Sequence, residues 1–202
     1  MKVVSTEIFK YNELSEKAKE KAREWYRKLN SQDNFWSESV IDDAKEAAKH
    51  LGFHIDKVYF SGFWSQGSGA CFEGIFRSSE LEAGGIRAYA PQDTELQRIA
   101  DEIEKIINQF YLVALKVRHS GHYSHENCTD FTVSITDNED NEVDSKEAAD
   151  AEKNLIELSK SLMKWIYRNL EKEYEYQNTD EQIVENIEAN DYNFTESGKV
   201  WH

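Results

Sequence analysis

The chain has 202 residues and carries 39 acidic against 24 basic side chains, a formal net charge of −15. Hydrophobic residues make up 39% of it, and its 5 Trp, 10 Tyr and 10 Phe residues supply a core, which excludes an intrinsically disordered chain. Because affinity for phosphates comes mainly from Lys and Arg, this charge argues against direct binding of nucleic acid.

The sequence shows no linker between domains. Pro91 is its one proline, and no long Gly/Ser tract interrupts it, so we expect a single domain over residues 1–202. The start has no signal-peptide pattern and no stretch approaches membrane-spanning length, which favours a cytoplasmic protein without membrane contact. In that compartment Cys71 and Cys128 are expected to be reduced.

The N-terminal quarter predicts one strand followed by two helices. Residues 2–10 are rich in β-branched side chains, which is typical of a strand. The next segment has an apolar face at helical spacing, formed by Leu14, Ala18, Ala22, Trp25 and Leu29. A second helix is predicted over residues 34–51, with Gly52 as the glycine that ends it.

The middle of the chain predicts two hairpins with a helix between them. Residues 54–66 and 70–77 form the first strand pair, and residues 111–119 and 128–136 the second. Between the pairs, a turn at the adjacent glycines 84 and 85 leads into a short strand at residues 86–89. A third helix begins at Thr94, with Gln97 as its capping-box partner.

The C-terminal third predicts two more helices. The longest begins at Asp144, with Glu147 in the capping-box position, and the last follows Thr179, with Gln182 in the same role. The tail, residues 191–202, predicts a strand or a hairpin.

Strands joined by short turns pair antiparallel. We therefore predict an α+β fold: an antiparallel sheet built from two related β-hairpins plus the N-terminal strand, with about five helices packed on it.

One pattern occurs in both predicted hairpins. Lys-Val-x-x-Ser-Gly-x-aromatic-Ser-Gln/His spans residues 57–66 and again residues 116–125, and a cysteine follows each copy. We therefore treat residues 55–77 and 112–136 as pseudo-repeats. If the two hairpins lie side by side in one sheet, their turns meet, and we expect a pseudo-twofold axis between them.

The paired turns are the candidate binding site. Trp64 and Tyr123 would offer flat stacking surfaces, and the glycines at 62 and 121 would admit a ligand. The candidate ligand-binding residues are Ser61, Phe63, Trp64, Ser65, Gln66, Arg118, His119, Ser120, His122, Tyr123 and His125.

The histidines suggest two further chemistries. His119, His122 and His125 could bind a transition metal together with Cys128, but their spacing matches no common zinc signature. They could also act as acids and bases near neutral pH, with Cys71 or Cys128 as nucleophile. A cysteine after a glycine turn is more often a small core residue. We therefore assign no metal ligand, no cofactor and no catalytic residue.

The run YFSGFWSQGSGACFEG, with ELSEKAKEKAREWY before it and RHSGHYSH and EKEYEY after it, resembles a family of uncharacterised proteins encoded by tailed bacteriophages and prophages. The likeness covers most of the chain, and Asp is common in the family where this chain has Ser68. Some members carry an automatic name as the antitoxin of a toxin–antitoxin system. The resemblance implies a phage accessory protein that acts on host machinery or host immunity.

From the residues and the resemblance together, we expect a phage-encoded, non-enzymatic binding protein in the host cytoplasm that counteracts a host defence system. It would sequester a nucleotide-like signal between the paired hairpins, or bind a host defence protein through its acidic surface. The alternatives are a small hydrolase or nuclease dependent on the histidine cluster, and an acidic antitoxin that neutralises a toxin. Self-association into a homo-oligomer is left open.

Overall fold

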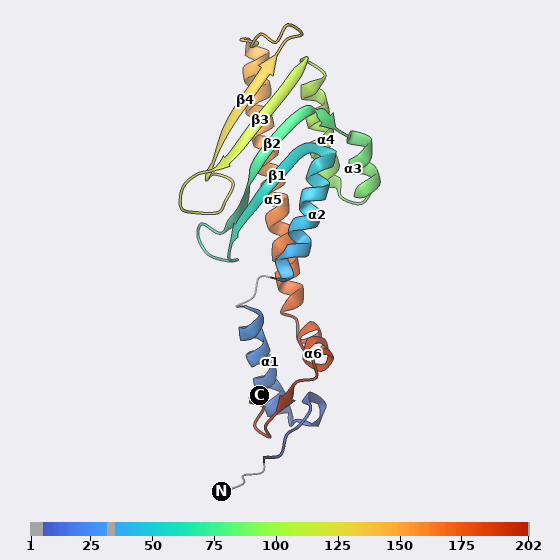
Figure 1. Ribbon diagram of the computed structural model, residues 1–202, viewed down its shortest axis with the longest axis vertical. Coiled ribbons are helices and arrows are strands. Elements are labelled where there is room, and N and C mark those ends of the chain that lie inside the picture. Colours follow the sequence, from blue (N-terminus) through green and yellow to red (C-terminus); the bar gives the residue numbers. More distant parts are fainter. Residues whose placement is uncertain (1–5, 32–34, 202) are drawn as a thin grey trace. The chain divides into compact units, whose positions relative to one another are not determined.

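The computed structural model describes residues 6–31 and 35–201 (Figure 1). In chain order the elements are the 3-10 helix η1 (Tyr11–Glu13), α1 (Glu16–Asn30), α2 (Trp36–His50), β1 (Leu51–Ser61), β2 (Gly69–Leu81), α3 (Ala83–Tyr89), α4 (Thr94–Ile107), β3 (Leu112–His119), β4 (Thr129–Thr136), α5 (Lys146–Gln177), α6 (Asp180–Ala189), β5 (Asn193–Phe194) and β6 (Val200–Trp201). These residues thus form six α-helices, a four-stranded sheet and a two-stranded sheet, which confirms the α+β class.

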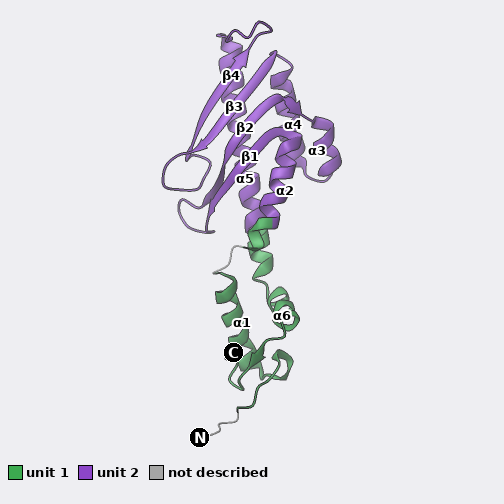
Figure 2. Cartoon of the chain, in the orientation of Figure 1, with its two compact units in different colours: residues 1–38, 172–202 green, residues 39–171 purple. Residues whose placement is uncertain are grey.

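The chain divides into two compact units (Figure 2). We call residues 39–171 the sheet unit, and residues 1–38 with 172–202 the terminal unit. The expectation of one domain over the whole chain stays a prediction, and each unit is described by itself.

The sheet unit contains both predicted hairpins. Its strands are antiparallel and follow the order β1-β2-β3-β4, so the hairpins lie side by side as expected. The expected pseudo-twofold axis is wrong. In this order β1 and β3 run in the same direction, so one hairpin is related to the other by a shift across the sheet.

One face of the sheet is covered by helices, with α2, α4 and α5 behind the strands in Figure 1. The buried positions alternate along β3 as the strand period requires: Val113, Leu115 and Val117 are buried, whereas Lys116 is exposed. Phe53 packs against Phe72 and Phe76 in the same layer, with ring centroids 5.9 and 4.9 Å apart.

Asp93 joins two of these helices. It is the N-cap of α4, where its Oδ1 accepts a hydrogen bond from the Leu96 backbone N–H at 2.9 Å. Its Oδ2 accepts from Trp165 Nε1 of α5 at 2.6 Å. The capping box expected at Thr94 is therefore wrong by one residue. A carboxylate can cap α4 and bind the indole at once, whereas a threonine side chain has one oxygen.

Two local predictions are also wrong. The strand expected at residues 86–89 is part of α3, which includes both adjacent glycines and buries Ile86. Residues 6–10, the described part of the predicted N-terminal strand, are not a strand of the four-stranded sheet. In the described part of that segment, Phe9 makes one bridge, to Phe194 of the terminal unit, while residues 1–5 lie outside the described residues.

The terminal unit packs α1 against α6 and the β5–β6 hairpin. Its buried core comes from both ends of the chain: Tyr11, Leu14, Ala18, Ala22, Ile183, Ile187 and Phe194. The cap expected for its last helix is confirmed, because the Thr179 side chain accepts from the Gln182 backbone N–H.

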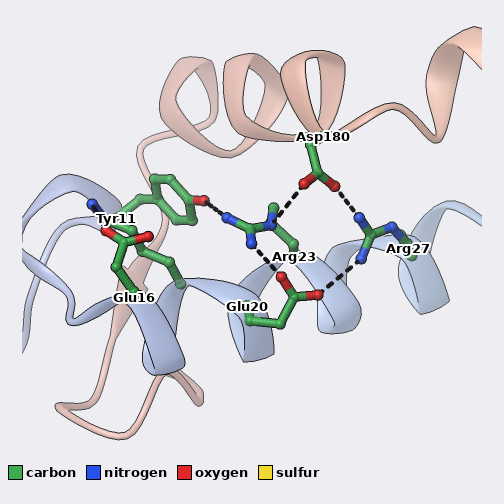
Figure 3. A network of polar contacts seen from close by, with 7 residues as sticks. Tyr11, Glu16, Glu20, Arg23, Arg27 and Asp180 are labelled. Atoms are coloured by element: carbon green, nitrogen blue, oxygen red, sulfur yellow. Dashed lines mark hydrogen bonds and ion pairs between the residues drawn. The ribbon is translucent and has the colours of Figure 1, made fainter.

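Charged side chains also join α1 to the start of α6 (Figure 3). Arg23 donates to the Tyr11 hydroxyl at 2.8 Å and to Glu20. Arg27 donates to Asp180 and lies 3.6 Å from Glu20, and Asp180 also lies 3.5 Å from Arg23 Nε. Two carboxylates thus alternate with two guanidinium groups, and this network lowers the pKa of Glu20, mainly through its hydrogen bond from Arg23.

Candidate functional site

The loops of the two hairpins meet. We call residues 62–68 the first loop and residues 120–128 the second loop. Both lie at the same end of the sheet, because β1 and β3 run in the same direction (Figure 1). A Cβ atom added to Gly67 would lie 3.1 Å from the Tyr123 ring, and one added to Gly69 would lie 2.4 Å from His125 Cβ. Such close approach requires glycine at these two positions.

The first loop is held by a serine turn and by α5. The Ser68 backbone N–H donates to the Ser65 carbonyl at 3.1 Å, and the two hydroxyls are 2.6 Å apart, so both hydroxyls are used within the loop. The Tyr167 hydroxyl of α5 donates to the Gly62 carbonyl at 3.1 Å, and its ring lies 5.4 Å from that of Phe63. Phe63 therefore anchors the loop to α5.

Trp64 has a different role from Phe63. Its backbone adopts the left-handed region, with φ 66°, and 71% of the residue is exposed. A left-handed conformation is uncommon for a bulky residue and is kept only where the surrounding structure holds it. The loop therefore holds a large aromatic ring in solvent.

The second loop is held by His119. Its ring stacks on Tyr59 with centroids 4.4 Å apart, and its Nε2 lies 3.0 Å from the Tyr123 carbonyl, to which the N–H donates. Tyr123 itself is 54% exposed, and His122 is exposed with its ring against the Tyr123 edge. The second loop thus presents Tyr123 and His122, while His119 is structural.

His125 is engaged on both ring nitrogens. Nδ1 accepts from the Asn127 backbone N–H at 3.1 Å, which places the ring proton on Nε2, 3.6 Å from Cys128 Sγ. A neutral imidazole in this tautomer cannot take the thiol proton at Nε2, because that nitrogen already carries one. The geometry therefore does not favour His125 as a general base for Cys128.

Carboxylates surround the place where the loops meet. Glu73 accepts from the Tyr59 hydroxyl at 2.8 Å and from the His119 backbone N–H at 3.3 Å. Glu126 lies 3.4 Å from Lys164 of α5. Burial, together with the Cys128 thiol and these two carboxylates, raises the pKa of Cys71 to about 12. A phosphate group placed beside Glu73 would therefore face a negative charge, whereas Glu126 is paired with Lys164.

The other predicted site residues lie around this junction. Ser61 Oγ is buried, and no described residue bonds it. The Ser120 backbone N–H closes the second loop by donating to the Cys128 carbonyl at 2.8 Å. Gln66 is exposed, and Arg118 is exposed on β3 opposite Asp130. The structure thus brings the two predicted halves together and leaves Trp64 and Tyr123 as their exposed aromatic side chains.

Sequence reasoning missed four residues that position this site: Tyr59, Glu73, Glu126 and Tyr167. Tyr59 could have been found from the sequence, because it lies inside the repeated pattern at residues 57–66. Tyr167 could not, because nothing local marks which turn of a long helix will contact a loop far away in the sequence.

The described residues contain neither a candidate metal site nor a candidate membrane-spanning helix. Over residues 6–31 and 35–201, no group of three His, Cys, Asp or Glu side chains is arranged to hold a metal ion. In the same residues, no helix combines the length and apolar character needed to cross a bilayer.

Comparison with known proteins places the chain in one family. No curated protein and no solved structure gives a significant match. A family described as a domain of unknown function, DUF8835, matches residues 36–180, which include both hairpins and the contacts of both loops. The match spans more than half of the chain, so the protein belongs to the DUF8835 family, a family of uncharacterised function.

Proposed function

We propose that this chain is a phage-encoded, non-enzymatic binding protein that counteracts a host defence system in the host cytoplasm by binding one of its proteins. One observation carries the proposal: two adjoining loops hold Trp64 and Tyr123 in solvent. Exposed Trp and Tyr side chains on a rigid support are the usual anchors of protein interfaces. The phage origin rests on the resemblance of residues 59–74.

The surroundings of the loops support a protein partner over a nucleotide. The loops fill the space between them, since Gly67 packs on Tyr123 and Gly69 on His125. Glu73 adds negative charge there, and the whole chain carries −15. A partner with a basic surface would complement this field, and electrostatic attraction would speed its association.

A nucleotide-like signal is the second candidate, because two features favour it. The buried Ser61 hydroxyl has no partner among the described residues, so a ligand could supply one. The Tyr123 and His125 rings are stacked, with an interplanar angle of 14°, and could continue the stack onto a base.

The enzymatic alternative receives less support from the geometry. His119 uses Nε2, and His125 uses both ring nitrogens, in contacts within the second loop. An antitoxin would bind a toxin through the same exposed aromatic side chains and the same negative charge. Identification of the bound protein therefore distinguishes this role from the first proposal.

The test is an infection assay in cells that carry an active defence system. Expression of the wild-type chain should restore plaque formation, and Trp64→Ala or Tyr123→Ala should abolish the effect. Loss of one such anchor costs about 2 kcal/mol, roughly a thirtyfold loss of affinity. Tyr111→Ala is the matched control, since Tyr111 is 69% exposed but precedes β3, at the other end of that strand from the second loop. Equal loss of effect in all three variants would refute the role of the loops.

Native mass spectrometry of the chain recovered from those cells separates the candidates. A protein-sized adduct that Trp64→Ala abolishes supports the first proposal. A small adduct with nucleotide absorbance supports the second. Cleavage of nucleotide by the wild-type chain, lost in His122→Ala, would support the enzyme.

A further inference from the structure

The outer edge of β4 is open. β4 pairs with β3 on one side and is the last strand of the sheet (Figure 1). The Val143 backbone N–H donates to the Ile135 carbonyl at 2.9 Å, so the backbone polar groups of Ile135 point away from β3. These groups alternate along an antiparallel strand, so those of Val133 and Phe131 also point outward. Within residues 6–31 and 35–201, no hydrogen bond to the outward groups of Phe131 and Val133 is recorded.

The chain already begins a further strand beside β4. Asp137 N–H donates to the Asn141 carbonyl at 3.0 Å, and the Val143 bond follows it, so residues 141–143 run along the C-terminal end of β4. This added segment stops beside Ile135. The remaining edge, towards Phe131, offers the same bonds to a strand from elsewhere.

A groove continues this edge between β4 and the start of α5. Its volume is about 400 Å³. Its apolar lining is Val133, Ile135, Val143, Ala148 and Ala149, and its polar lining is Glu142, Asp144, Ser145 and Glu152. Among the described residues that line it there is no Lys or Arg. An apolar floor with carboxylates at its margin suits the long stem and charged head of a Lys or Arg side chain.

The segment next to this groove, residues 137–152, is strongly acidic. Between residues 137 and 152 the chain has 8 acidic side chains, and Lys146 is the one basic side chain. Backbone hydrogen bonds from Asn141 and Glu139 lower the pKa of Asp137, which favours its ionised form. Because each copy of the chain carries a net charge of −15, electrostatic repulsion disfavours a second copy as the occupant.

We propose that β4 accepts an extended, basic segment of a partner protein as an additional strand. The segment exchanges backbone hydrogen bonds with Phe131 and Val133, and one of its Lys or Arg side chains lies in the groove, with its head near Glu142 and Glu152. This inference rests on the proposed function in taking the partner to be a protein. It adds where that protein binds and by which chemistry: along the edge of β4, which begins directly after the second loop.

The test uses a labelled synthetic peptide of alternating lysine and valine as the probe. Its binding, measured by fluorescence anisotropy, should weaken about tenfold in Glu142→Gln combined with Glu152→Gln, as loss of two partly exposed charges predicts. Glu104→Gln, on α4, is the control and should bind the probe like wild type. A peptide of alternating glutamate and valine should not bind.

Amide hydrogen exchange followed by NMR tests the strand addition itself. On saturation with the probe, exchange at Phe131 and Val133 should slow, while Thr132 and Ser134, whose N–H groups already face β3, should stay unchanged. No slowing, or equal binding of a probe N-methylated at alternate residues, overturns the proposal. So does a dimer that protects Phe131 and Val133 without the probe.

The two proposals can fail separately. Trp64→Ala should keep full affinity for the probe, because Trp64 lies in the loop between β1 and β2, and β3 separates those strands from β4. Probe binding without any anti-defence effect refutes the proposed function alone, and an effect lost only in the loop variants, with no probe binding, refutes the β4 site alone.

Discussion

Replacement of Gly69 by alanine is the most direct test of the contact between the two loops. The added Cβ would lie 2.4 Å from His125 Cβ and 2.9 Å from His125 Cα. Carbon atoms in ordinary contact are about 3.5 to 4.0 Å apart, so the overlap is roughly 1 Å. Cα and Cβ cannot rotate away as the tip of a side chain can, so the second loop must move as a whole.

The expected cost is that of overpacking a close contact, about 1 to 3 kcal/mol. For a chain of this size each 1 kcal/mol lowers the unfolding midpoint by roughly 2 to 4 °C. Gly62→Ala is the matched control, since its Cβ would meet nothing within 4 Å and its φ is not in the left-handed region. Replacing glycine by alanine also lowers the conformational entropy of the unfolded chain, which raises the stability. Both variants share this effect, so it cancels in the comparison.

Thermal unfolding by calorimetry measures both variants, and NMR spectra report the resonances of His125. We expect Gly69→Ala to unfold several degrees below Gly62→Ala and to shift the His125 resonances. If both variants unfold at the same temperature, the loops do not touch as described and the reasoning about a joint surface fails.

Two further predictions concern titrating groups. Alkylation with iodoacetamide at pH 8 should modify Cys128 well before Cys71, because Cys71 is 1% exposed and its pKa is raised to about 12; equal labelling of both thiols in the folded chain would contradict the burial of Cys71. Glu20→Gln should lower the thermal midpoint of the terminal unit at pH 7, because the pKa of Glu20 is held below its usual value of 4.5 mainly by Arg23. A lowered pKa gives stability that is present above the usual value and disappears as pH falls through the lowered one, so the two chains should converge in acid. Melts followed by circular dichroism across that pH range would show the convergence, and a constant difference would argue against it.

The sequence predicted those elements of the fold that depend on local residue patterns. Runs of strand-favouring residues around turn residues located both hairpins, and the repeated pattern predicted that their loops would adjoin. The repeat did not predict their conformations. Gly62 and Gly121 are equivalent in the pattern, yet only Gly121 of the two has positive φ.

Local patterns failed where a distant contact decides the structure. The adjacent glycines of α3 predicted a turn, but burial of Ile86 and the hydrogen bond from the Tyr89 hydroxyl to Asp43 of α2 favour a helix there. The cap of α4 was misplaced because Trp165 engages Asp93 from a position 72 residues further along the chain. Tyr167, which holds the first loop, was missed for the same reason: its contact with Gly62 is distant in the sequence.

The terminal unit has a consequence for synthesis of the protein. Its core joins Ala18 and Ala22 of α1 to Ile183, Ile187 and Phe194, so α1 must wait for packing partners that are made much later. At usual translation rates that interval is on the order of ten seconds. A helix of this length is marginal in water without its packing partners. The sheet unit ends at residue 171 and does not include α1, so α1 stays open to chaperones or proteases until residues 183–194 have been made.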